Sequence, residues 1–122
     1  MNTIKIQIKG HLKSLNNNGT TIIDTKGIKN KNKISYIQNE ISHKLTLENN
    51  KIYLIRENKE FKNIFEFELN KKNKCYYLLK ENNIEIDINI ETQKIENNNN
   101  KIIIIYKVLD SNEIYEYKIE MR

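Results

Sequence analysis

The sequence contains no proline, no tryptophan and no alanine, and it has a single cysteine, Cys75. One cysteine cannot form an intramolecular disulfide, so no covalent crosslink holds the fold and a reducing compartment suits the chain. The three glycines, Gly10, Gly19 and Gly27, are too scattered to form a loop that cradles phosphate. Stability must therefore come from a hydrophobic core, and residues 1–122 are long enough to build one as a single domain.

Long apolar runs are also missing. The longest, residues 102–106, is far too short to cross a bilayer. Residues 1–6 alternate apolar and polar at once and contain no apolar signal core. From these two features we expect no contact with a membrane and a cytoplasmic location.

Arginine is scarce as well. The net charge is +5, but Arg56 and Arg122 are the only arginines, and lysines scattered along the chain supply the remaining positive charge. A nucleic-acid surface normally needs clustered basic residues, usually with arginine forks and stacking aromatic rings. Nucleic acid is therefore not the partner that the composition favours.

The most frequent pattern in the chain is the alternation of apolar and polar residues. Isoleucine, asparagine and lysine make up roughly half of the residues. Residues 84–90 alternate isoleucine with a polar residue without a break, which predicts a β-strand with all its isoleucines on one face. Similar runs recur about every ten residues, a spacing typical of β-barrels and β-sandwiches.

We expect about nine or ten strands, with short asparagine-rich turns between most of them. Asn18 and Gly19 predict a type I′ hairpin turn with positive φ, and Gly27 is expected to end the second strand. Residues 37–45 also fit a helical i, i+4 spacing, so a short helix is the alternative there. The segments with strand signals, from which these strands are expected, are residues 4–12, 20–26, a short one through Ile28, 34–38, 45–47, 52–56, 65–69, 75–80, 84–90, 102–109 and 114–121.

The turns are too short for crossover connections, so consecutive strands should pair in antiparallel fashion. With little helix to cover it, the apolar face of such a sheet must be buried by closure or by folding over. Closure also removes exposed strand edges. We therefore predict an all-β fold, an antiparallel up-and-down meander that closes into a β-barrel of about 8–10 strands.

Several short motifs follow one another along the chain: residues 25–27 (Thr-Lys-Gly), 34–36 (Ile-Ser-Tyr), 45–47 (Leu-Thr-Leu), 51–56 ending in Arg56, 90–92 (Ile-Glu-Thr), Ile95, and 102–106 ending in Tyr106. Their order resembles that of the YwiB-like family of small bacterial proteins, whose fold is a lipocalin-like (calycin) β-barrel. The chain departs from the family at residues 37–39, where acidic residues are usual, and at Asn58, where glycine is usual. The resemblance implies architecture and no activity.

Arg56 is the first candidate for a binding site. It ends an apolar strand on the parity of Ile52 and Leu54, so its side chain should point inward. A guanidinium there can clamp a carboxylate or phosphate with two parallel hydrogen bonds. The alternative is a structural plug that pairs with a carboxylate such as Glu66 or Glu85.

Tyrosines form the second candidate group, because they give a cavity an apolar wall with a polar tip. Tyr36 and Tyr106 stand out because they fall within the motifs above. Tyrosine also fills strand positions without any binding role. The other tyrosines considered are Tyr53, Tyr77, Tyr115 and Tyr117.

The sequence favours no catalytic or metal site. His11 and His43 lie far apart and lack neighbouring ligands, so a metal site would need both to meet Cys75 in space. No arrangement of serine or cysteine with histidine suggests a nucleophile, and the strand acids occupy solvated faces. We expect a protein that is not an enzyme and needs no cofactor.

Two functions remain open. One is a barrel that binds a small apolar or amphipathic ligand inside, anchored by Arg56. The other is a filled barrel whose lysine-rich outer face contacts RNA or an acidic protein. A homodimer, formed through a strand edge or an outer apolar patch, is compatible with either.

Overall fold

The computed structural model describes residues 3–98 and 100–122; Met1, Asn2 and Asn99, which the sequence places in the first strand and in a turn, lie outside the described residues. The described residues form ten strands and no helix. None of them belongs to a helix long and apolar enough to span a membrane. The strands are β1 (Thr3–Ser14), β2 (Thr20–Asn30), β3 (Lys33–Gln38), β4 (Ile41–Leu47), β5 (Lys51–Glu57), β6 (Phe61–Glu68), β7 (Lys72–Leu79), β8 (Ile84–Asn98), β9 (Lys101–Val108) and β10 (Glu113–Met121).

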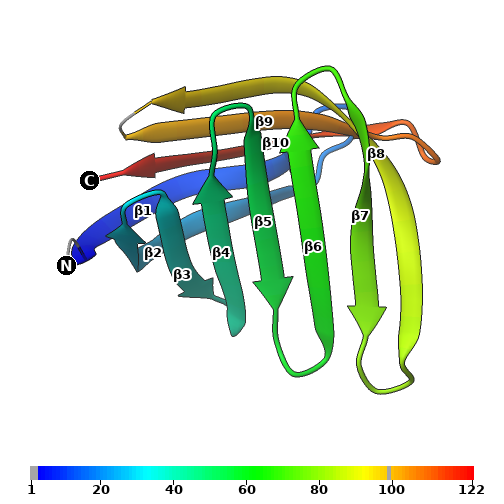
Figure 1. The fold of residues 1–122 in the computed structure, drawn as a ribbon, viewed down its shortest axis with the longest axis horizontal. Helices are drawn as coiled ribbons and strands as arrows, with labels where there is room; N and C mark the ends of the chain where they lie inside the picture. The colour runs from blue at the N-terminus through cyan, green and yellow to red at the C-terminus, as the bar shows by residue number, and fades with distance from the viewer. Residues whose placement is uncertain (1–2, 99) are drawn as a thin grey trace.

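These strands close into an antiparallel barrel in chain order (Figure 1). Each strand pairs with the next one along the chain, and β1 pairs with β10, from Ile8 opposite Met121 to Ser14 opposite Tyr115. The short turns leave no room for a crossover, so neighbours in sequence become neighbours in space. The predicted all-β meander barrel is confirmed.

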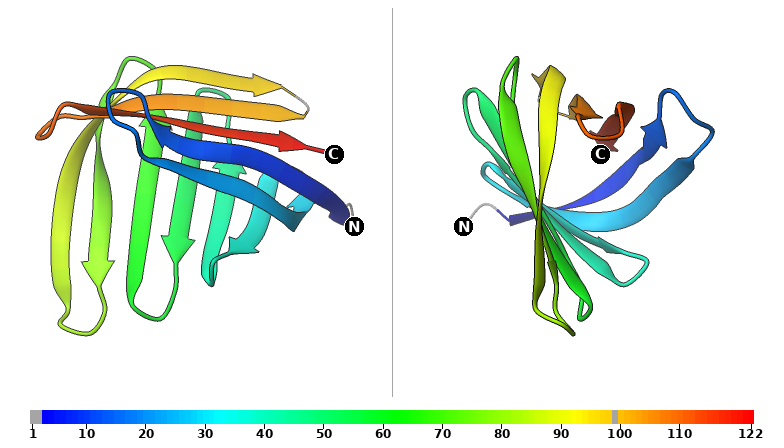
Figure 2. Two further views of the ribbon diagram at one scale, coloured as in Figure 1. Left: turned by 180° about the vertical axis from the view of Figure 1, so that it is seen from behind. Right: turned by 90° about the vertical axis from the view of Figure 1, so that its right-hand side faces the viewer.

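The barrel is flattened into two layers whose strands cross at a steep angle (Figures 1 and 2). β4 to β7 lie in one layer, and β1, β2, β9 and β10 lie in the other. The long strand β8 belongs to both, because its first half pairs with β7 and its second half with β9. A bulge between Thr92 and Lys94 bends β8 where it passes from one layer to the other.

The core lies between the two layers and is mainly isoleucine. Alternate residues of each strand point into it, as the sequence pattern predicts. Phe67 is the largest fully buried side chain. The fully buried aliphatic residues around it are Ile8, Ile34, Leu45, Ile52, Ile90, Ile102, Ile104 and Ile119.

Burial departs from the prediction at one place in β8. Ile84 and Ile86 are 43% and 44% exposed, although they share the face of the buried Ile90. The turn between β7 and β8 extends well beyond the strands of the other layer (Figure 1). The inner face of this hairpin is therefore uncovered at its tip.

Two predicted strand boundaries are wrong. Gly27 does not end a strand but lies within β2, where it is paired with Ile6 on one side and Tyr36 on the other. Residues 37–45 form no helix, because Asn39 and Glu40 make a tight turn between β3 and β4. Both turn residues have positive φ, 53° and 65°, as a type I′ hairpin requires.

The predicted type I′ turn at Asn18 and Gly19 is also wrong, since no glycine has positive φ. The loop is longer than two residues and closes when the Ser14 N–H donates to the Gly19 carbonyl at 2.9 Å. The Asn16 side chain ties it to the turn before β10, donating to the Asn112 carbonyl at 3.0 Å and accepting from the Ile114 N–H at 3.2 Å.

Candidate functional site

A row of polar side chains crosses the inner face of the barrel at one level. The strand register places Tyr36 of β3 beside His43 of β4, His43 beside Arg56 of β5, and Arg56 beside Asn63 of β6. All four residues share the inward parity of the buried residues on their strands. The register therefore gathers on one wall groups that lie well apart in sequence.

Arg56 is the only cation in this row, and it is partly buried. Its Nε donates to Nε2 of His43 at 3.3 Å, and its Cζ lies 5.8 Å from the centre of the Phe61 ring. Arginine has five N–H donors. Among the described residues, this bond to His43 is the only hydrogen bond or ion pair that Arg56 makes.

The structure gives Arg56 no carboxylate partner within residues 3–98 and 100–122. Glu66 contacts Lys51 at 3.1 Å, and Glu85 accepts a hydrogen bond from the Tyr76 hydroxyl at 2.9 Å. Neither of the carboxylates considered for a structural plug therefore meets the guanidinium.

His43 is neutral chiefly because it is buried, and its hydrogen bonds fix which ring nitrogen carries the proton. Nδ1 donates to the Ile41 carbonyl at 3.1 Å, which leaves Nε2 without a proton and able to accept from Arg56. Burial, together with the positive charge of Arg56, lowers the pKa of His43 from its usual 6.5 to about 4. The ring also stacks on Tyr36, with centroids 4.4 Å apart.

Beside this row, the hydroxyls of two tyrosines form a hydrogen bond. Tyr36 and Tyr117 lie with their oxygens 2.6 Å apart across the barrel, joining β3 to β10. Burial raises the pKa of Tyr36 to about 12 and that of Tyr117 well above its usual value. Both phenols are therefore neutral hydrogen-bonding groups at physiological pH.

Tyr106 of β9 is also buried, and it packs among aromatic rings. Its ring lies 5.1 Å from Phe67, 5.9 Å from Phe65 and 5.5 Å from Tyr115. Burial raises the pKa of its phenol. In the part of the chain that the structure describes, its hydroxyl has no hydrogen-bond partner.

These groups line a cavity of about 80 Å³ inside the barrel. Its wall combines aliphatic and aromatic residues, among them Ile23, Leu54, Phe65 and Phe67, with the polar groups of Tyr36, His43, Arg56, Tyr106 and Tyr117. No described aspartate or glutamate lines it. The wall therefore offers one positive charge and several hydroxyls in an otherwise apolar space.

The cavity reaches the surface beside the seam between β2 and β3. These strands pair only through residues 27–30 and 33–36, so the first half of β2 lies apart from β3. The Gln38 side chain bridges the gap, donating to the Ile22 carbonyl at 2.7 Å and accepting from the Asp24 N–H at 2.9 Å. Gln38 and Asn39 line the cavity beside it.

Arg56, Tyr36 and Tyr106, the three residues singled out from the sequence, all line this cavity. The parity argument for Arg56 is confirmed. His43 was considered only as a metal ligand, and its part in the row was missed, although it shares the inward parity of Ile41 and Leu45. Its pairing with Arg56 depends on strand register, which the sequence does not specify.

The residues considered for a metal site do not meet. His11 donates a hydrogen bond from Nε2 to Oε1 of Glu116 at 2.7 Å between β1 and β10, whereas His43 lies on the inner wall. Cys75 is buried on β7, and burial raises its pKa to about 12. Within the described residues, no three His, Cys, Asp or Glu side chains gather so as to hold a metal ion.

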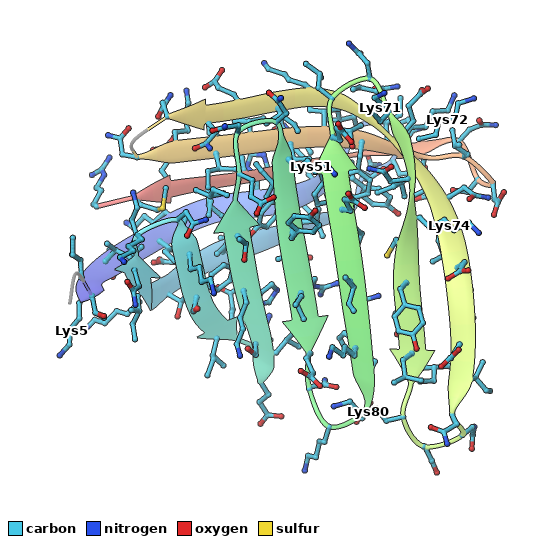
Figure 3. All side chains as sticks on the ribbon, viewed as in Figure 1. Lys5, Lys51, Lys71, Lys72, Lys74 and Lys80 are labelled. Carbon is cyan, nitrogen blue, oxygen red and sulfur yellow. The ribbon has the colours of Figure 1, made fainter. Side chains whose placement is uncertain are left out.

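The outer lysines are dispersed. Figure 3 shows labelled lysines in different parts of the fold, with Lys5 near one end, Lys51 near the middle of the view and Lys80 at the lower turns. Lys71, Lys72 and Lys74 lie together around the start of β7. Several pair with acids, such as Lys80 with Glu57 at 2.8 Å and Lys74 with Asp87 at 3.8 Å. These pairs offset part of the positive charge locally.

No known protein family and no curated protein matches this chain in sequence. In structure it is similar to the YwiB protein from Bacillus subtilis, with a TM-score of 0.75. The two are 15% identical, and the similarity covers 98% of this chain and 90% of that one. The chain therefore has a YwiB-like fold.

Proposed function

We propose that this protein is a cytoplasmic, lipocalin-like barrel that binds a small amphipathic ligand in its interior, without catalysis, and holds the polar end of the ligand on Arg56. The observation that carries the proposal is the guanidinium at the wall of the cavity, with most of its N–H donors unused and no carboxylate among the described residues to neutralise it.

The energetic argument supports a ligand at this position. A charge that is withdrawn from water without a partner is costly, and natural proteins seldom keep one unless it pairs or binds. The rest of the wall is suited to an apolar group, with Phe65, Phe67 and Leu54 beside the guanidinium. A ligand with an acidic end and an apolar end would complement both parts.

The chemistry of the wall favours binding over catalysis. A general base works best with a pKa near the working pH. The pKa of His43, about 4, makes it a poor base, and the raised pKa of Tyr36 keeps its phenol protonated. Neutral, hydrogen-bonded groups of this kind are suited to binding a ligand.

The competing function, a filled barrel whose basic face contacts RNA or an acidic protein, has less support. A nucleic-acid surface needs basic side chains gathered on one face. Here the lysines are spread over the molecule, and several already pair with acids (Figure 3).

Native mass spectrometry of the purified protein tests the proposal. We expect the wild type to carry a small molecule that denaturation releases, and we expect Arg56→Met to lose it. The matched control is Lys80→Met, which also removes a cation but lies outside the cavity. The proposal fails if Arg56→Met retains the molecule as well as Lys80→Met does. It also fails if the wild type carries none and a panel of small amphipathic acids does not raise its melting temperature.

A further inference from the structure

The charge, the donor geometry and the volume of the cavity further restrict the chemical class and the size of the ligand. Resting on the proposed binding function, we infer that the ligand is a short-chain monocarboxylic acid of about four or five carbons, bound as its carboxylate on the two Nη groups of Arg56.

The first argument is charge. Arg56 is the one cation on the cavity wall, and no described acid faces it there. His43 adds no charge, because its Nδ1 donates to the Ile41 carbonyl while its Nε2 accepts from Arg56. A single, partly buried positive charge balances a monoanion. A dianion such as hydrogen phosphate would keep an uncompensated charge in an apolar space, which is strongly unfavourable.

The second argument is the shape of the donor set. Nε of Arg56 is already used by His43, which fixes the guanidinium and leaves its two Nη groups. Those groups present parallel N–H donors whose spacing matches the two oxygens of a carboxylate. The Tyr106 hydroxyl, which lacks a partner among the described residues, adds a further polar group to the same wall. His43 acts here as a positioning residue for Arg56.

The third argument is size. A cavity of about 80 Å³ is several times smaller than sites for drug-sized ligands, which measure about 300 Å³ or more. A fatty acid with a long chain would exceed this space, whereas an acid of four or five carbons matches the small volume better. Its alkyl chain would lie against Phe65 and Phe67, which belong to the apolar part of the wall.

The experiment is isothermal titration calorimetry of the full chain at neutral pH with four probes: butyrate, its neutral analogue butyramide, inorganic phosphate and decanoate. We expect butyrate to bind and each of the other three to bind about 100-fold more weakly or not at all.

Arg56→Met should weaken butyrate binding about 100-fold, and Arg56→Lys, which keeps the charge but loses the fork, about 10-fold. Lys80→Met should bind as the wild type does. Circular dichroism confirms that each variant is folded.

The outcomes separate this inference from the proposed function. Phosphate binding more tightly than butyrate, with loss in Arg56→Met, overturns the carboxylate assignment. Decanoate binding more tightly than butyrate, with loss in Arg56→Met, overturns the inferred chain length. Either result leaves Arg56 as the anchor of the proposed site. Butyramide binding as tightly as butyrate overturns the inferred role of charge. If neither the four probes nor a wider panel of amphipathic acids binds the wild type, both the inference and the proposed function fail.

Discussion

Arg56 is a single residue whose charge should reduce the stability of the fold. Its guanidinium is partly buried, and among the described residues only His43 accepts a hydrogen bond from it. Ion pairs and charges placed in protein interiors are often replaced by apolar residues with no loss, or with a gain, of stability. In the absence of ligand, Arg56 should therefore lower the stability of the barrel.

We predict that Arg56→Met raises the free energy of unfolding of the unliganded protein by about 1 kcal/mol. Methionine keeps much of the arginine stem and removes the charge. The measurement is urea unfolding followed by far-UV circular dichroism. Lys80→Met, which removes a half-buried cation outside the cavity, is the control and is expected to change stability by less than about 1 kcal/mol. A loss of 2 kcal/mol or more in Arg56→Met, a threshold about twice the predicted change, would instead indicate a structural plug.

His43 should make stability depend on pH in a defined range. Its pKa is lowered on folding, so between about pH 6.5 and pH 4 the unfolded chain binds more protons than the folded one. Stability should therefore fall as the pH drops through this range and level off below it, by at most about 3 kcal/mol. Arg56 on β5 and Tyr36 on β3 are the groups that face the ring.

The check is the difference in free energy of unfolding between the wild type and His43→Gln as a function of pH. Glutamine can still accept from Arg56 but does not titrate. Other groups, such as Glu57 and Glu116, also have lowered pKa values, and the subtraction removes their contribution. A difference that stays constant between pH 7 and pH 4 would contradict the neutral buried state of His43.

For individual residues, the sequence predicted the orientation of Arg56 but not its neighbour. Parity alone predicted that Arg56 points inward with Ile52 and Leu54. It did not predict that His43 lies beside Arg56, because that contact depends on which residues of β4 and β5 are paired. Register follows from turn geometry, and the turns before and after these strands carry asparagine and charged residues that suit several turn types.

Among the elements, β1 and β10 close the barrel, and their approach depends on Gly10. A methyl group added to Gly10 would come within 1.8 Å of the Lys118 carbonyl oxygen, which is backbone and cannot move aside alone. β10 therefore passes too close to β1 for any side chain at this position.

We predict that Gly10→Ala lowers the free energy of unfolding by about 3 kcal/mol, because the β1–β10 pairing must shift. Gly19→Ala is the matched control. Nothing lies within 4 Å of a methyl group there, and the glycine has no positive φ. The control should stay within about 0.5 kcal/mol of the wild type. Equal effects of the two substitutions in thermal or urea unfolding would contradict the close approach.

The elements also show where sequence patterns stop being informative. Strict alternation identified most strands correctly, but it could not show that β8 is a single strand shared by two layers. The bulge between Thr92 and Lys94 breaks the alternation, so β8 resembles two unrelated segments in sequence. The tight turn at Asn39 and Glu40 was missed because neither residue is glycine.

For the whole molecule, the predicted meander barrel is confirmed because short turns and period-two alternation leave few other solutions. The two-layer shape was not predicted, since it depends on the bend in β8 and on the short seam between β2 and β3. That shape explains why Ile84 and Ile86 are exposed at one end of the molecule while a cavity remains inside it.

A crystal structure of the protein grown with butyrate tests the central claim, that Arg56 anchors a small ligand inside the barrel. The account predicts a carboxylate with its two oxygens about 3 Å from the two Nη groups of Arg56, and an alkyl chain against Phe65 and Phe67. A cavity that holds only water while Arg56 pairs with a carboxylate of the protein itself would contradict it.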